Sequence, residues 1–90
     1  MSAGKWVVYL VRCSDYTLYC GVTNDLGSRL VAHNAGKGAK YTKSRRPVEL
    51  VCASHRMSKS EAFKLEYRIK RIPAHRKPIE LAAQPPKAAI

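Results

Sequence analysis

The sequence predicts an α/β fold: a small three-stranded antiparallel sheet packed with helices, in the order β-β-α-β-α. Three observations indicate it. Two short apolar segments are joined by turn residues, two segments carry helix-capping signals, and a third apolar segment follows Pro47. Ninety residues suit one domain, with a core only just large enough for independent stability.

The first two strands are predicted from residue type and from the turn between them. Residues 6–13 are almost all apolar and rich in β-branched and aromatic side chains, which is typical of a buried strand. Residues 14–17 supply turn chemistry, so residues 18–23 should form the second strand of an antiparallel hairpin. Because side chains alternate along a strand, Tyr9 and Tyr19 project to the same side if the hairpin register aligns them.

The first helix is predicted from its capping residues. Thr23 or Asn24 can cap a helix that runs to about Ala35, and Asp25 in its first turn would interact favourably with the helix dipole. A basic loop follows, and residues 48–53 form the third predicted strand.

The second helix is predicted from a capping box. Residues 58–61, Ser-Lys-Ser-Glu, match that motif, and the helix should reach roughly Ile72 before Pro73 stops it. We therefore expect one domain over residues 1–78. Residues 79–90 are expected to form a flexible C-terminal tail, with at most a short helical turn near its start.

The charge of the chain indicates its class of partner. Seventeen Lys and Arg against six Asp and Glu leave a formal net charge of +11. Such a field attracts polyanions, so nucleic acid is the first partner to consider. An anionic membrane surface is the second, but no long basic amphipathic helix supports it. A ribosomal or otherwise purely binding protein would carry the same charge, so charge alone does not indicate an enzyme.

The cysteines and the length of the apolar runs argue against several other classes of protein. Cys13, Cys20 and Cys52 are odd in number and lack C-x-x-C spacing, which argues against a zinc site and a disulfide framework. Each lies in an apolar stretch, where cysteine packs as a small hydrophobe. The start of the chain lacks a signal-peptide core, and no apolar run approaches membrane-spanning length. We expect a cytoplasmic protein without a membrane partner.

Glu66 stands out because of its neighbours on the second helix. Ala62, Leu65, Glu66 and Ile69 follow the spacing of one helix face. A carboxylate among apolar side chains is costly unless something pairs with it. The partner could be Lys70 in an intrahelical ion pair, a nearby arginine, or a hard cation such as Mg²⁺.

Arg29 and His33 are four residues apart and therefore neighbours on the first helix. Leu26 and Leu30 lie on or beside the same side, which directs the polar pair toward the protein body. Arginine offers a planar fork for phosphate oxygens, and neutral histidine can accept a proton or simply form hydrogen bonds. Each alone, like each tyrosine, could be structural. Two tyrosines, this pair and Glu66 on elements that should pack together favour a functional site.

The order of these residues resembles the GIY-YIG nuclease family, especially its small single-domain bacterial members. Those are similar to the catalytic domain of a eukaryotic structure-specific endonuclease subunit and to the N-terminal domain of the excision-repair protein UvrC. The resemblance covers roughly residues 5–77. Two departures, Val7 for a glycine and Cys20 for an isoleucine or valine, are at packing positions. The matching segments are Val7-Val8-Tyr9, Tyr19-Cys20-Gly21, Thr23 to Leu26 leading to Arg29 and His33, Gly36 to Thr42, and Glu66.

The resemblance implies hydrolysis of a DNA phosphodiester with one divalent metal ion, Mg²⁺ or Mn²⁺, bound by Glu66. It also implies a catalytic role for each polar residue. Tyr9 would position or deprotonate the attacking water, with His33 as a rival base or as a relay to Tyr9. Arg29 would balance the charge that develops on the phosphate, and Tyr19 would hydrogen-bond a phosphate oxygen or the water.

The loop after the first helix is the predicted nucleic-acid contact. It is either a solvated basic loop or a surface that tracks the phosphate backbone, where the tyrosine could stack on an unpaired base. Such binding has little sequence preference, which favours a structure- or strand-selective nuclease on single-stranded or branched DNA, in repair or recombination. The alternatives are a non-catalytic nucleic-acid-binding module and a nuclease subunit that needs a protein partner. The loop residues concerned are Lys37, Lys40, Tyr41, Lys43, Arg45 and Arg46.

Overall fold

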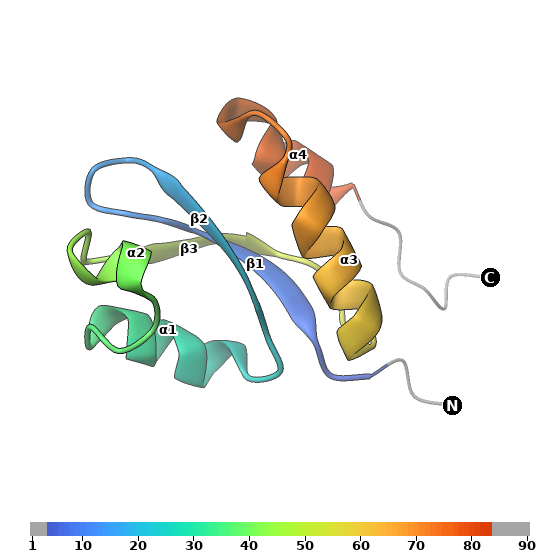
Figure 1. Ribbon diagram of the computed structural model, residues 1–90, viewed down its shortest axis with the longest axis horizontal. Coiled ribbons are helices and arrows are strands. Elements are labelled where there is room, and N and C mark those ends of the chain that lie inside the picture. Colours follow the sequence, from blue (N-terminus) through green and yellow to red (C-terminus); the bar gives the residue numbers. More distant parts are fainter. Residues whose placement is uncertain (1–3, 84–90) are drawn as a thin grey trace.

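The computed structural model describes residues 4–83 and confirms the α/β prediction. Its sheet has the strand order β2-β1-β3, and both strand pairs are antiparallel. Figure 1 shows α1 and α2 on one side of this sheet and α3 and α4 on the other. The elements are β1 (Val7–Arg12), β2 (Leu18–Thr23), α1 (Leu26–Asn34), α2 (Lys40–Lys43), β3 (Glu49–Ala53), α3 (Lys59–Lys70), the 3₁₀ turn η1 (Ala74–Arg76) and α4 (Lys77–Ala82).

The central strand β1 divides the core into two parts, because its side chains alternate between the faces of the sheet. Val8 and Leu10 are buried against α3 and α4, together with Cys20. Tyr9 and Val11 are buried on the other face, beside residues of α1. The two cores are therefore separated by the sheet, and so are helices α1 and α3.

The hairpin register decides where the two tyrosines point. Tyr9 of β1 pairs with Gly21 of β2, and Val11 pairs with Tyr19. Directly paired residues share a face of the sheet, so Tyr9 and Tyr19 project to the same side. The sequence prediction that depended on this register is confirmed.

The N-terminus of α1 differs from the prediction. Asp25, rather than Thr23 or Asn24, is the capping residue, and its carboxylate accepts a hydrogen bond from Ser28 N at 3.2 Å. The Thr23 hydroxyl instead accepts from Asp25 N at 3.0 Å. This bond turns the chain between the end of β2 and Asp25, and the helix begins at Leu26. The short helix α2 was also not predicted, since its segment reads as a basic loop.

The capping box of α3 is confirmed: the Ser58 hydroxyl accepts from Glu61 N, and the Glu61 carboxylate accepts from Ser58 N. The expectation of a flexible tail from residue 79 is wrong for residues 79–82. These residues belong to α4, and Leu81 is only 1% exposed within the core beneath α3. Lys77 Nζ also donates to the carbonyl of Ile69 at 2.7 Å, which ties α4 to the end of α3. Residues 84–90 lie outside the described residues.

The cysteines behave as predicted for small hydrophobic residues. Cys13 and Cys20 are buried, one in each core, while Cys52 is half-buried, and all three are free thiols. None of the helices within residues 4–83 is long and apolar enough to span a membrane.

Candidate active site

His33 is the centre of a buried hydrogen-bonded chain. It is fully buried on α1, with Nε2 2.7 Å from Tyr9 Oη and Nδ1 2.8 Å from Thr42 Oγ1. The Thr42 hydroxyl donates to the carbonyl of Ala39 at 3.1 Å, so it accepts from His33 Nδ1–H. Nε2 then carries no proton and accepts a hydrogen bond from the Tyr9 hydroxyl. The network thus assigns the tautomer of the imidazole.

The protonation states of this chain follow from burial. Burial lowers the pKa of His33, and the nearby Arg29 guanidinium lowers it further. Burial also raises the pKa of Tyr9 above 10.0, although the adjacent Arg29 opposes this shift. At neutral pH, a neutral imidazole therefore faces a protonated phenol. A phenol in this state cannot act as a base alone, but it can pass a proton to His33.

Two glycines make room for the Tyr9–His33 pair. A Cβ on Gly21 would lie 2.4 Å from Tyr9 Oη, and a Cβ on Gly38 would lie 2.4 Å from His33 Nδ1. Both rings are fully buried and cannot move away. Gly21 therefore belongs to the site because any side chain at this position would collide with Tyr9. Gly38 allows the loop before α2 to close over the imidazole.

Tyr19 extends the site toward solvent through an aromatic stack. Its ring lies 5.4 Å from His33, centroid to centroid, and 5.8 Å from Tyr41 in a nearly parallel arrangement. The guanidinium of Arg45 lies 4.0 Å from the centroid of Tyr41. The Tyr41 ring is thus engaged within the protein, and 39% of the residue remains exposed.

Arg29 supplies positive charge beside Tyr9. Among the described residues, its Nε is a buried nitrogen without a hydrogen-bond partner. Buried polar atoms of this kind are rare in folded proteins and call for an explanation. An anion that enters beside Tyr9 would provide the missing acceptor, and a phosphate oxygen matches the geometry of a guanidinium.

Glu66 lies on the other side of the sheet from His33. Its carboxylate is 3.3 Å from Lys70 Nζ, so the intrahelical ion pair considered from the sequence is present. Helix α3 packs against strand β2, and the pKa of Cys20 on that strand is raised to about 12 by burial and then by the charge of Glu66. Because β2 is an edge strand, Glu66 and Tyr19 flank the same edge from opposite faces. In the described part of the chain, no hydrogen bond joins Glu66 to the His33 network.

The chemistry of Glu66 suits a hard cation. Within residues 4–83 no three His, Cys, Asp or Glu residues form a metal-binding group, so Glu66 would hold a cation with few protein ligands. Mg²⁺ accepts this arrangement because water and phosphate oxygens complete its coordination. The Glu66 side chain is 18% exposed and its partner Lys70 is 52% exposed, so Lys70 can turn to solvent when a cation replaces it.

The basic segment between α1 and β3 is partly tied down. Arg45 Nε is 3.1 Å from the carboxylate of Asp15, and Arg46 Nε donates to the carbonyl of Lys43 at 2.8 Å. Both guanidinium groups thus hold this segment in place rather than pointing freely into solvent. The exposed cations of the segment are Lys37, Lys40 and Lys43, with Arg46.

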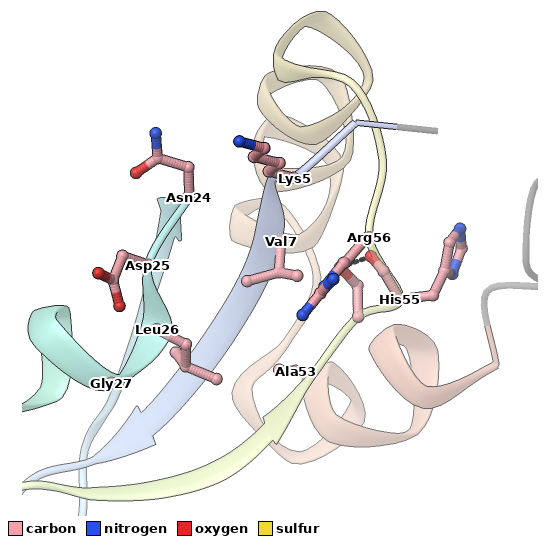
Figure 2. Close-up of a pocket in the computed structure, with 10 residues that line it drawn as sticks. Lys5, Val7, Asn24, Asp25, Leu26, Gly27, Ala53, His55 and Arg56 are labelled. Atoms are coloured by element: carbon pink, nitrogen blue, oxygen red, sulfur yellow. Dashed lines mark hydrogen bonds between the residues drawn. The ribbon is translucent and has the colours of Figure 1, made fainter. Parts of the chain in front are cut away.

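A hollow of about 550 Å³ lies at the N-terminus of α1. Figure 2 shows Val7 and Leu26 beside it and Arg56 extending over it from the end of β3. Lys5 lines the same hollow. None of the described residues in the Tyr9–His33 network lines it, so this hollow is separate from the buried network.

Sequence reasoning missed Thr42 and Asn34. The Asn34 side chain accepts from Val48 N at 2.7 Å and donates to the Val48 carbonyl at 3.1 Å, which joins the end of α1 to the start of β3. Thr42 orients His33 from nine residues away. Thr42 lies in a segment that resembled the family, yet nothing in residue type or spacing pairs it with a histidine.

The family model described as the GIY-YIG catalytic domain matches residues 5–77. A solution NMR structure of a UPF0213 protein from Bacillus halodurans is similar, with a TM-score of 0.50 and 40% identity. It covers 80% of this chain and 77% of the other.

Curated relatives carry the same label. A UPF0213 protein of Nitratidesulfovibrio vulgaris is 50% identical over 72 residues, which are 80% of this chain and 66% of the relative. One from Staphylococcus epidermidis is 56% identical over 66 residues, covering 73% of this chain and 80% of the relative. The UPF0213 protein YazA of Bacillus subtilis is 47% identical over 77 residues, covering 86% and 78%. The chain thus spans just under two thirds of the first of these relatives and about four fifths of the other two.

Proposed function

Because the chain belongs to the GIY-YIG family, we propose that it is a metal-dependent endonuclease that hydrolyses DNA phosphodiester bonds. The observation that carries this proposal is the buried Tyr9–His33–Thr42 chain beside the partnerless Nε of Arg29. The chain supplies a proton acceptor, and the arginine supplies an N–H donor for the oxygen of an anion. Both are needed to hydrolyse a phosphodiester.

In the proposed reaction, a water molecule next to Tyr9 attacks the phosphorus. The water gives a proton to Tyr9 Oη while Tyr9 gives its own proton to His33 Nε2, so that Tyr9 acts as a relay and His33 as the base. The new bond joins the water oxygen to phosphorus, and the bond to the 3′ oxygen breaks. Thr42 holds Nδ1–H and thereby stabilises the imidazolium that forms.

Arg29 and Tyr19 would stabilise the reacting phosphate. The Arg29 guanidinium balances the negative charge that develops, through the nitrogen that has no protein acceptor. The Tyr19 hydroxyl would hydrogen-bond a phosphate oxygen or the water. Glu66 would hold Mg²⁺ or Mn²⁺, which when bound polarises the phosphate and stabilises the leaving oxygen.

Phosphate contacts would hold the substrate with little sequence preference. The exposed lysines of the loop and the net charge of +11 support binding through the DNA backbone. We include single-stranded or branched DNA as substrate, the cytoplasm as location, and repair or recombination as role in this proposal. The three free thiols suit a reducing compartment.

A second candidate is a nucleic-acid-binding module without catalysis. The Glu66–Lys70 ion pair favours it, because it satisfies the carboxylate without a metal ion. A nuclease subunit that becomes active only with a protein partner is the intermediate case, in which the partner would shift this ion pair.

The test is a cleavage assay on labelled single-stranded, duplex, flap and branched DNA, with Mg²⁺ or Mn²⁺ and with EDTA. Arg29→Ala and Glu66→Ala should each lower the cleavage rate by roughly 100-fold or more while the protein still binds DNA. Arg68→Ala, at an exposed position of α3, is the control for loss of charge. If wild type and Glu66→Ala behave alike on every substrate, the isolated chain is not the enzyme proposed.

A further inference from the structure

The solvent-facing side of α3 carries two large aromatic residues that the core does not use. Phe63 is 47% exposed and Tyr67 is 64% exposed. They are four residues apart, so they are neighbours on one helix face. Lys59 and Arg71 extend the same row by four residues at each end. We call this row, together with Trp6, the α3 stripe.

A cation stands at each end of the α3 stripe, and the aromatic rings lie between them. Lys59 Nζ lies 5.2 Å from the centroid of Trp6, and Trp6 lies 6.1 Å from Phe63, centroid to centroid. Arg71 lies 5.1 Å over the ring of Tyr67 and donates to its hydroxyl at 3.0 Å. The stripe thus combines partly exposed aromatic rings with positive charge, which is the composition of surfaces that bind single-stranded nucleic acid.

The charge around the α3 stripe selects the partner. The two carboxylates of α3 are both engaged: Glu61 belongs to the capping box, and Glu66 is paired with Lys70. A net positive surface repels basic partners and attracts a polyanion. Its rings require that the polyanion also offers flat apolar faces, which unpaired bases do and duplex DNA does not.

The α3 stripe borders the candidate metal ligand. Glu66 directly precedes Tyr67 and is three residues after Phe63, so it lies at the edge of the stripe nearest the core. A strand with a phosphate at Glu66 would therefore have neighbouring nucleotides within reach of these rings. Tyr41 is less available for the same task, because it is less exposed than Phe63 and Tyr67 and its ring packs against both Tyr19 and Arg45.

We propose that the α3 stripe is a stacking platform for unpaired bases of the DNA strand held at the active site. The inference rests on the proposed nuclease function and deepens it, because it accounts for a preference for single-stranded or splayed DNA. Phe63 and Tyr67 stack on successive bases, while Lys59 and Arg71 contact the phosphates on either side of this pair.

Trp6 allows a direct test, since it is the one tryptophan of the chain and lies against Phe63. Its fluorescence is followed in EDTA, so that no cleavage occurs, during titration with oligothymidylate. The matched titrant is an abasic oligomer of equal length, which has the same phosphates and no bases. We expect oligothymidylate to change the fluorescence and to bind more tightly than the abasic oligomer.

Variants then locate the contact. Tyr67→Ala and Phe63→Ala should each weaken oligothymidylate binding by roughly five- to a hundredfold and leave abasic binding nearly unchanged. Arg68→Ala should weaken both titrants alike. Tyr67 is exposed, so its replacement should retain the fold, which a thermal melt checks.

Three results would overturn the platform. In the first, Tyr67→Ala and Phe63→Ala bind oligothymidylate as tightly as wild type while metal-dependent cleavage persists; the nuclease proposal then stands and the platform falls. In the second, wild type binds both oligomers equally. In the third, the alanine variants alter sedimentation of the protein alone and not DNA affinity, which would assign the stripe to a contact between copies. Wild type that neither binds nor cleaves DNA would refute both proposals.

Discussion

Replacing Thr42 with valine is expected to destabilise the protein and to impair proton transfer at His33. Valine has the shape of threonine without the hydroxyl, so the packing around this fully buried position is retained. The substitution removes the acceptor for His33 Nδ1–H and the donor to the Ala39 carbonyl. The imidazole is then free to adopt the other tautomer, in which Nε2 carries the proton and cannot accept one from Tyr9.

The magnitude follows from burial. A buried donor left without its acceptor costs about 1–3 kcal/mol in the free energy of unfolding. For a domain of this size, each kcal/mol lowers the melting temperature by roughly 4–8 °C, so a drop of roughly 4 °C or more is expected. Thr42→Ser retains the hydroxyl and should recover most of the cleavage rate, although it loses a buried methyl group.

The assays are urea denaturation and metal-dependent DNA cleavage measured on the same protein samples. The hydrogen-bonded chain is refuted as a functional unit if Thr42→Val cleaves as fast as wild type. It is also refuted if Thr42→Ser and Thr42→Val lose the same activity, because the hydroxyl would then be irrelevant. A loss of stability alone would leave Thr42 with a purely structural role.

Three further predictions test other features of the structure. Burial places the folded-state pKa of His33 below its ordinary value of 6.5, so the unfolded chain binds a proton at a higher pH than the folded protein does. Stability to urea should therefore fall as pH decreases below about 6.5. His33→Gln should reduce this dependence of stability on pH. Gly21→Ala, whose Cβ would meet Tyr9 Oη at 2.4 Å, should lower the free energy of unfolding by about 1–3 kcal/mol. The control is Gly27→Ala in α1, whose Cβ would have its nearest neighbour at 3.9 Å and should raise that free energy by up to about 1 kcal/mol. A Gly21→Ala protein as stable as wild type would contradict the close packing. Leu81→Ala should cost about 2–5 kcal/mol in thermal or urea unfolding, because this side chain is 1% exposed; an unchanged midpoint would restore the expectation of a loose tail.

Local signals explain why most of the fold could be predicted. The capping box at Ser58 and the apolar runs of the strands depend on residues close together in the chain, and the structure places them as expected. The α1 cap was misplaced by one or two residues, because the choice among Thr23, Asn24 and Asp25 depends on backbone geometry. α4 was expected as no more than a helical turn in a flexible tail, for a related reason: six residues with a proline near the start become a stable helix only by burying Leu81 in the core beneath α3.

The candidate site could also be predicted only in part. Arg29 and His33 were predicted to point inward from their spacing on one helix, and the structure places His33 in the core and Arg29 beside Tyr9. The partners of these groups could not be predicted, since Thr42 reaches His33 across a loop. The metal-binding role of Glu66 and the DNA contacts of the basic loop stay predictions.

What the sequence determined by itself was the three strands, the two longer helices, the family and the positive charge, because these depend on residue type, order and local spacing. Tertiary structure alone decided which groups meet. It placed Gly21 opposite Tyr9, set the tautomer of His33 through Thr42, and put Glu66 across the edge strand from Tyr19. Strand register and the closure of loops set these contacts, and both result from packing between segments far apart in the chain, which no local pattern records.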